Sequence, residues 1–442
     1  MQIYRLQGLA LLLLAVGCQT VREARKTQSA PFVPRHYALF TPEEPLTLKQ
    51  SELWTLAYHP DFAIATQDVV QAEIALHEAG VNLRPQFAAT IGISGNSESS
   101  DRNNWHIHSS HEALSASLNL SWVLYDFGRT RAKQRQAVAN LQGAATSYRE
   151  TTLERIYQTR ASFYDLAKAN EECHVAEENL RLYARLREEA QLKLDIGKGR
   201  RYDLTKAAAE ETSARVELTV ASNQLSVARA ALLNNLSIRS DGFIHYRWEE
   251  LPSLPVETLS DAFVLARTNN PTLCIQYANR AAASNAVDLA IADLYPELSI
   301  SLSPSYLHNA AETVGISWGG HLIDTLFSGF SKEDNLKRAT SALKQANAQL
   351  IRQEEALLME LETAWADLHS AQDNLVDATT LQRQATENFE LVEEEFKVGK
   401  ATILERSDAQ TTLTQARVKH LTAACTVEKS KAKLLQLLGV DL

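Results

Sequence analysis

The sequence predicts a mainly α-helical chain with transmembrane β-strands, built from a helix–strand–strand–helix unit that occurs twice. Two stretches, 130–196 and 331–398, run for 67 and 68 residues without proline and with Gly143 as their only glycine. At 1.5 Å per residue, each would form a helix roughly 100 Å long, several times the usual globular length. Four shorter segments alternate apolar and small polar residues with the period of a β-strand.

The duplication is visible as short matches at nearly constant offsets. Arg84-Pro85 recurs as Tyr295-Pro296, 211 residues later. Ile196-Gly197-Lys198 recurs as Val398-Gly399-Lys400, 202 residues later. The repeating unit is therefore roughly 200 residues long, with small insertions and deletions.

These matches predict the domain organisation. A first repeat covers 48–238, an equatorial linker covers 239–258, and a second repeat covers 259–442. The predicted strands lie at about 86–97, 114–125, 297–307 and 312–323, and the long helices at 128–196 and 330–398.

The N-terminus has the pattern of a secretion signal over 1–17. Arg5 precedes an apolar run at 9–16 that is too short to span a bilayer as a helix. Ala15-Val16-Gly17-Cys18 resembles a bacterial lipobox, which implies that Cys18 is lipidated; a plain cleaved signal or an incidental cysteine is the alternative. Gln19 resembles the next residue of lipoproteins delivered to the outer membrane. Prolines within 18–47 predict an extended tether.

Composition excludes several functions. The formal net charge of -10, with no concentrated basic face, argues against a nucleic-acid partner. Cys173, Cys274 and Cys425 are far apart, without metal-type spacing, so neither a disulfide framework nor a metal site is expected. No phosphate-binding loop, zinc-protease motif or nucleophile elbow is present, and we expect no enzyme activity and no cofactor.

The strand segments have a pattern typical of a pore wall. In 114–124 the even positions are Leu, Ala and Trp, whereas the odd positions from 115 to 121 are Ser and Asn. A soluble sheet is the alternative, but its wet face usually carries Lys, Glu and Arg. Segments of this length and alternation match transmembrane strands. Four strands cannot close a barrel in lipid, so the strands must be shared between protomers of a homo-oligomer.

The long helices show coiled-coil-like packing. Leu336, Leu343, Leu350 and Leu357 repeat every seven residues. Return helices at roughly 202–236 and 403–438 are half as long, so helices at roughly 48–83 and 258–294 must cover the remaining halves. This arrangement predicts a hollow helical cylinder with a β-barrel at one end.

This order of elements resembles the TolC-like outer-membrane efflux proteins, also called the outer membrane factor family. The resemblance is carried by the duplication, by Tyr125-Asp126-Phe127-Gly128 and Phe327-Ser328-Gly329 at the barrel-to-helix turns, and by Phe396-Lys397-Val398-Gly399. It implies a homotrimer with a twelve-stranded β-barrel, four strands from each chain, and a long periplasmic α-barrel. Pro85, Gly128, Pro296 and Gly329 would mark the turns between helices and barrel.

The resemblance also implies a function. A protein of this kind is a passive exit conduit in the bacterial outer membrane, fed by an inner-membrane pump through a periplasmic adaptor. The lipobox resembles that of the branch exporting drugs or metal ions. A type I secretion exit duct is the alternative, followed by a lipid-anchored coiled-coil scaffold.

Candidate site residues follow by analogy with the family. The glycine tips would meet the adaptor, through Ile196, Gly197, Lys198, Val398, Gly399 and Lys400; the other interpretation is that the glycines only supply a turn. Glu405 and Asp408 share one helix face and would form an acidic ring at the periplasmic gate, or else an ordinary helix start. His106, His108 and His111 could ligate a metal, but are interpreted as polar loop residues.

Overall fold

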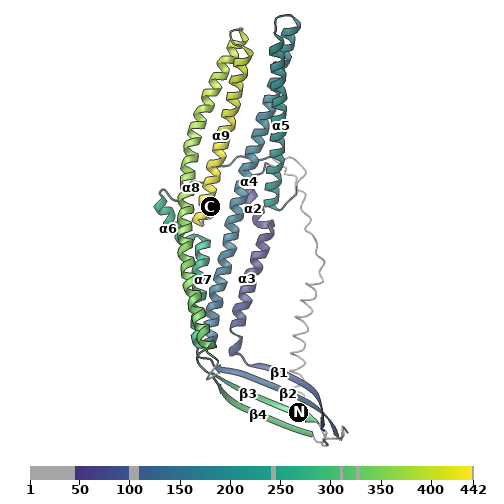
Figure 1. Cartoon of the computed structure of the whole chain (residues 1–442), viewed down its shortest axis with the longest axis vertical. Helices are drawn as coiled ribbons and strands as arrows, with labels where there is room; N and C mark the ends of the chain where they lie inside the picture. The colour runs from purple at the N-terminus through teal and green to yellow at the C-terminus, as the bar shows by residue number, and fades with distance from the viewer. Residues whose placement is uncertain (1–44, 99–108, 240–244, 309–311, 325–328, 441–442) are drawn as a thin grey trace. The chain divides into compact units, whose positions relative to one another are not determined.

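The computed structural model describes residues 45–98, 109–239, 245–308, 312–324 and 329–440. Their order is helices, two strands, a long helix and a return helix, followed by the same order again (Figure 1). The predicted mainly helical architecture with a few antiparallel strands is confirmed. None of the described helices combines the length and apolar content needed to cross a lipid bilayer.

The two longest helices are α4 (Arg129–Asp195) and α8 (Ser331–Lys397), each of 67 residues. Their return helices, α5 (Arg201–Leu236) and α9 (Ile403–Leu438), have 36 residues each. The second half of α4 packs along α5, and the first half packs along α3 (Pro60–Ala79) and α7 (Pro271–Ala292). The shorter helices therefore cover both halves of the long one, as the sequence predicts.

The helices that precede the strands differ from the prediction. Where one helix was expected at roughly 48–83, the chain forms α2 (Leu48–Tyr58), α3 and the 3-10 turn η1 (Val81–Leu83). The break lies at His59, which has extended backbone and caps α3 through Nδ1, with Pro60 at the first helical position. Proline disfavours helical backbone in the preceding residue. Asn270-Pro271 separates α6 (Leu259–Asn269) from α7 in the same way.

The four strands form one antiparallel sheet in the order β1 (Gln86–Glu98), β2 (Ser109–Tyr125), β3 (Glu297–His308) and β4 (Glu312–Ile323). Strands from the two repeats meet where β2 pairs with β3. Within the described residues, β1 pairs only with β2, and β4 only with β3. One edge of each outer strand is thus open.

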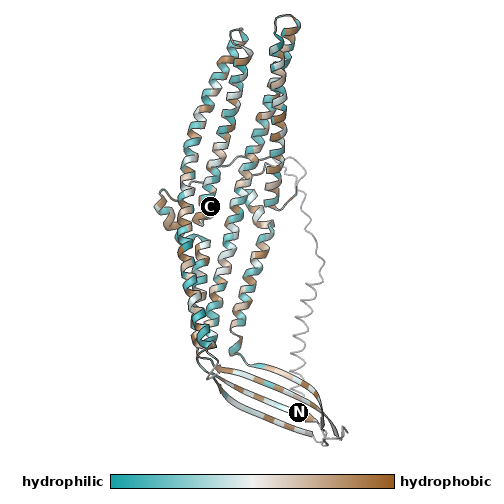
Figure 2. Cartoon of the chain, in the orientation of Figure 1, coloured by the Kyte–Doolittle hydropathy of each residue, from teal (hydrophilic) through white to brown (hydrophobic). Residues whose placement is uncertain are grey.

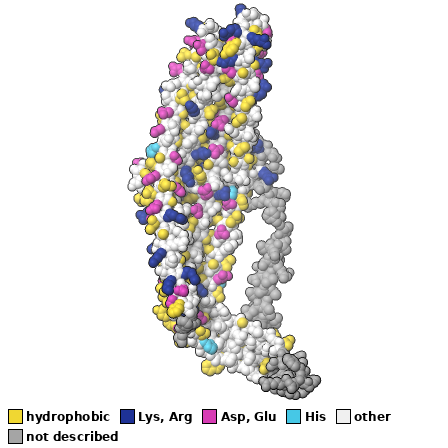
Figure 3. All heavy atoms as spheres, in the orientation of Figure 1, with side chains coloured by type: hydrophobic (Ala, Val, Ile, Leu, Met, Phe, Trp, Pro, Cys, Tyr) yellow, Lys and Arg dark blue, Asp and Glu magenta, His cyan; other side chains and the backbone are white. Residues whose placement is uncertain are grey.

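The register puts most of the apolar residues of the four strands on one face. Phe87 lies opposite Leu120, and Leu302 lies opposite both Leu120 and Trp318. On the other face, Ser117 pairs with Ser305, and Ser303 pairs with Ser317. Figure 2 shows the resulting alternation of colour along each strand, and in Figure 3 the charged side chains lie over the helices rather than the visible part of the sheet.

Small residues allow the helices to approach closely. Ala364, Ala371, Ala378 and Ala385 are buried along α8. A leucine-rich core joins α6, α8 and α9, with Leu361, Leu434 and Leu438 fully buried. Burying a leucine side chain contributes roughly 1.5–3 kcal/mol, so this core is a main source of stability for the helical part.

Residues 245–251 tie the two repeats together at the middle of the long helices. Leu46 and Tyr246 form a parallel bridge, and Tyr164 of α4 donates a hydrogen bond to the carbonyl oxygen of Glu249 at 2.8 Å. Leu251 N donates to the buried Glu428 carboxylate of α9 at 2.7 Å. We call α4–α5 the first helical hairpin and α8–α9 the second. Backbone groups of this segment therefore form hydrogen bonds with side chains of both hairpins.

Candidate adaptor interface and gate at the hairpin tips

Both helical hairpins end in the same capping structure. Gly197 follows α4 with φ 75°, and Gly399 follows α8 with φ 76°. Lys198 N donates to the Lys193 carbonyl at 2.8 Å, and Lys400 N donates to the Glu395 carbonyl at 2.8 Å. This is the Schellman pattern, which requires left-handed backbone after the helix and therefore favours glycine. The turn function of the glycines is thus structural in both repeats.

Each turn has a large apolar side chain that is exposed. Ile196 is 66% exposed and Val398 is 70% exposed. A Cβ added at Gly197 or Gly399 would meet no atom within 4 Å, so the space next to each turn is open. Exposed apolar side chains at an open tip are typical of a surface that contacts another molecule.

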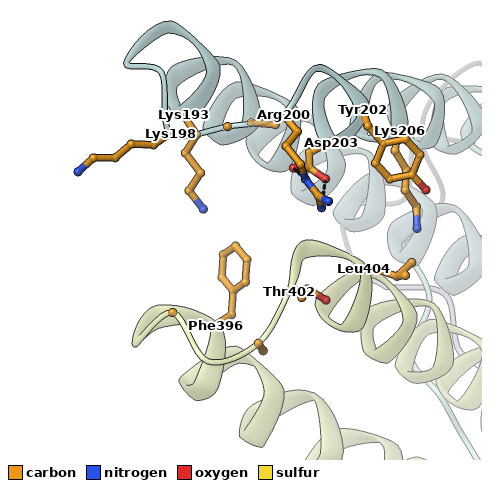
Figure 4. A pocket seen from close by; sticks show the side chains of 13 residues that line it. Lys193, Lys198, Arg200, Tyr202, Asp203, Lys206, Phe396, Thr402 and Leu404 are labelled. Carbon is orange, nitrogen blue, oxygen red and sulfur yellow. Dashed lines mark hydrogen bonds and ion pairs between the residues drawn. The ribbon is translucent and has the colours of Figure 1, made fainter.

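A groove of about 370 Å³ separates the two tips (Figure 4). Of the six predicted tip residues, Lys198 and Gly399 line it, and the other four do not. Its remaining walls come mainly from Lys193, Arg200, Tyr202, Lys206, Phe396 and Leu404. The groove therefore has residues from both hairpins and carries more basic than acidic side chains.

Arg406, which was not among the predicted site residues, joins the two hairpins next to the groove residue Phe396. Although charged, Arg406 is only 8% exposed. It pairs with Glu393 of α8, and its Nη1 lies 3.5 Å from Glu189 Oε2 of α4. The Phe396 ring has two cations nearby, Arg406 Cζ at 4.7 Å and Lys193 Nζ at 4.8 Å from its centroid. One side chain thus connects α4, α8 and α9.

A sequence signal for Arg406 did exist. Residues 406, 409, 413 and 416 follow helical spacing, and Ala409, Leu413 and Ala416 are buried. An arginine on such a stripe indicates a paired, buried charge. Its partners could not be predicted, because they lie on two other helices.

The predicted gate residues lie at the start of α9. Glu405 completes a capping box, accepting hydrogen bonds from Thr402 N at 2.7 Å and Thr402 Oγ1 at 2.8 Å. These hydrogen bonds hold the pKa of the Glu405 carboxyl below its usual range. Asp408 is exposed one turn later. The capping interpretation therefore applies to Glu405, and its carboxylate is nevertheless exposed and ionised at neutral pH.

The predicted turn residues lie between helices and strands. Pro85 directly precedes β1 and Pro296 directly precedes β3. Gly128 caps α4 with φ 90°, and Gly329 has φ 63° two residues before α8. Asp126 accepts hydrogen bonds from Gly128 N at 3.2 Å and Thr130 N at 2.7 Å, and so secures the barrel-side end of α4.

Some predicted residues lie outside the described part of the chain. They are Cys18, His106, His108, Phe327 and Ser328. His111 belongs to β2, where its backbone pairs with Asn96. Within the described residues, no group of three or more His, Cys, Asp and Glu side chains is placed to hold a metal ion.

Comparisons with known proteins agree with this architecture. Residues 55–236 and 263–440 match the family model described as "Outer membrane efflux protein". Protein CyaE of Bordetella pertussis is 24% identical over 332 residues, which cover 73% of this chain and 70% of CyaE. The outer membrane efflux protein BepC of Brucella suis is 23% identical over 331 residues, covering 73% of this chain and 71% of BepC.

A solved structure shares the fold. The Campylobacter jejuni CmeC outer membrane channel superimposes with a TM-score of 0.78 at 15% identity, over 94% of this chain and 91% of CmeC. The family model covers both repeats and leaves out 237–262, which contains the equatorial segment. On these findings, the chain belongs to the outer membrane efflux protein family.

Proposed function

We propose that this protein is the outer-membrane channel of a tripartite efflux system, in which three copies form a passive conduit for small molecules. The observation that carries the proposal is the sheet, whose two outer strands have open edges and most of whose apolar residues share one face. On that face Ile93 is 81% exposed and Trp318 is 82% exposed. Apolar side chains are stable when they face lipid. Open strand edges are not stable there, because their backbone N–H and C=O groups lack hydrogen-bond partners.

Three copies would satisfy both requirements. Pairing β1 of one copy with β4 of the next closes a twelve-stranded barrel without free edges. The apolar face would then meet lipid, and the Ser- and Thr-rich face would line a water-filled passage. The long helices would continue the passage as a periplasmic tube.

The tips would receive the periplasmic adaptor, which connects the channel to an inner-membrane pump. The exposed Ile196 and Val398, and the open space at Gly197 and Gly399, support this role. Glu405 and Asp408 would form an acidic ring at the periplasmic gate, since both carboxylates are exposed. Lipidation of Cys18 would anchor the chain to the inner leaflet of the outer membrane, with its helical part in the periplasm.

Native mass measurement of detergent-extracted protein tests the assembly. We expect a mass of three chains, because three copies close the barrel. A detergent-free, soluble monomer after signal removal would rule out the channel.

Gly399→Asp tests docking separately. An aspartate at this open position should abolish efflux-dependent drug resistance while the assembled channel remains in the outer membrane. Gly399→Asn is the matched control, because asparagine tolerates left-handed backbone and adds no charge. Full resistance with Gly399→Asp would refute the docking role.

A further inference from the structure

The groove between the two hairpin tips has an uneven distribution of charge. Lys193, Lys198, Arg200 and Lys206 line it, and all four come from the first hairpin. Asp203 is the one acidic residue among the lining residues. Figure 4 shows these basic side chains on one hairpin, with Phe396 pointing toward them from the other.

Two of the four cations are already paired within the hairpin. Arg200 forms hydrogen bonds with both carboxylate oxygens of Asp203, at 3.1 and 3.0 Å. Lys206 Nζ lies 3.7 Å from Glu210. In the described part of the chain, the ammonium groups of Lys193 and Lys198 have no carboxylate within 4.0 Å. The groove therefore has two cations available for an acidic ligand.

The apolar part of the groove is also open. Tyr202 is 65% exposed and Leu404 is 46% exposed, and they occupy equivalent positions in the two repeats, 202 residues apart. The volume of about 370 Å³ is near the lower end of ligand pockets, roughly 300–1,000 Å³. Such a space admits a few side chains of a projecting turn, but not a folded domain.

The repeats differ in charge at this place, although they share the same fold. The positions equivalent to Lys193 and Lys206 in the second hairpin are Glu395 and Asp408. The residues with which the second hairpin lines the groove are uncharged, so a molecule in the groove meets basic side chains from the first hairpin only. A basic side and an uncharged side would fix the orientation of an asymmetric partner.

We propose that this groove binds an acidic turn of the periplasmic adaptor, with one or more Asp or Glu carboxylates against Lys193 and Lys198 and an apolar side chain between Tyr202 and Leu404. This inference rests on the adaptor docking proposed above. Carboxylates form charge-assisted hydrogen bonds with ammonium groups, and exposed charges of this kind steer association and set register.

Site-specific photo-crosslinking in the native bacterium tests the occupant. The photoreactive residue p-benzoylphenylalanine replaces Tyr202 in the groove, or Val398 at the tip but outside the groove lining. Mass spectrometry then identifies the captured peptide. From Tyr202 we expect a periplasmic protein, captured within about one helical turn of an Asp or Glu. Capture of a peptide without a carboxylate, a lipid or a second copy of this chain would overturn the proposal.

Charge reversal tests the two lysines. Lys193→Glu with Lys198→Glu should reduce capture through Tyr202 by about tenfold or more, since two attractive contacts become repulsive. Lys193→Arg with Lys198→Arg should retain capture. The matched control is Lys397→Glu with Lys344→Glu, which changes the net charge equally at two exposed positions outside the groove. An equal loss with this control would show a general effect of net charge and refute the groove.

The two crosslinking positions also distinguish binding in the groove from adaptor docking at the tips. Capture through Val398 but not through Tyr202 would refute the groove and leave docking intact. Absence of capture from both positions would refute both. The amount of each variant in the outer-membrane fraction shows whether the chain still folds and assembles.

Discussion

Arg406 of α9 and Glu393 of α8 form a bidentate ion pair, with Nε to Oε2 at 2.5 Å and Nη2 to Oε1 at 3.1 Å. The first hairpin lacks this pair, because Leu204 and Gln191 occupy the equivalent positions. It has a different ion pair one or two turns away, between Arg187 and Glu211 at 2.8 Å. Phe389 and Leu413 replace that pair in the second hairpin and pack together. Among the described residues, each hairpin thus has one ion pair that joins its two helices, and the two pairs lie at different distances from the tips.

Removing Arg406 alone should loosen the second tip. Arg406→Ala leaves the partly buried Glu393 without its cation, which costs about 2–3 kcal/mol of local stability. We expect faster amide hydrogen exchange at 389–410 and little change near the strands. The double variant Arg406→Leu with Glu393→Gln copies the residues of the first hairpin and should recover most of the protection. If Arg406→Ala exchanges at the wild-type rate, Arg406 does not hold the tip together.

The Arg187–Glu211 pair should make stability depend on pH. The hydrogen bond from Arg187 holds the pKa of Glu211 below its ordinary value of 4.5. A lowered folded-state pKa contributes stability that is present above pH 4.5 and is lost as the pH falls through the lowered value. Glu211→Gln should therefore lower the thermal unfolding midpoint at pH 7, measured by circular dichroism.

The same variant should differ less from wild type in acid. Below the folded-state pKa, Glu211 is protonated and resembles glutamine. A deficit that stays constant from pH 7 to pH 3 would contradict an ionic contribution. Glu217→Gln is the control, because Glu217 is exposed on α5 and no ion pair with it is found in the described part of the chain.

The faces of the sheet can be tested with two neighbouring residues of β4. Ile316 lies on the apolar face and is 70% exposed, whereas Ser317 lies on the polar face opposite Ser303. A lysine facing the middle of a bilayer costs about 2–4 kcal/mol. Ile316→Lys should reduce insertion into the outer membrane. Ser317→Lys should insert and change conductance, and equal insertion of both variants would contradict the assignment of faces.

The acidic ring is tested by neutralising it without breaking the helix start. Glu405→Gln preserves the capping box, since glutamine also accepts from the helix N-cap, and Asp408→Asn keeps the shape of the side chain. Together they should reduce cation selectivity and block by divalent cations in single-channel recordings. Glu217→Gln again serves as the control. Unchanged selectivity in the double variant would remove the ring from the gate.

Much of the helical fold could be predicted from sequence, because periodicity and missing prolines determine long helices locally. The two glycine tips were also predictable, because turn formation depends on a few neighbouring residues. Strand register was not, since alternation alone does not show that Phe87 faces Leu120 or that Leu302 faces Trp318. The breaks at His59 and Asn270 required the cap geometry, although the following prolines suggested them.

The site was harder to predict than the fold. Glycine tips follow from local turn chemistry, but the contacts of Arg406 join residues 13 and 217 positions apart in sequence. The groove likewise depends on how two hairpins pack. Side chains that are distant in sequence are brought together by tertiary structure, which a single sequence does not show.

The central claim is that copies of this chain share their strands to form an open passage through a membrane. Conductance of the purified, detergent-extracted protein in a planar lipid bilayer tests it most directly. The account predicts discrete, cation-selective conductance steps from the wild type and fewer insertion events from Ile316→Lys. A folded protein that enters the bilayer and gives no conductance steps would contradict it.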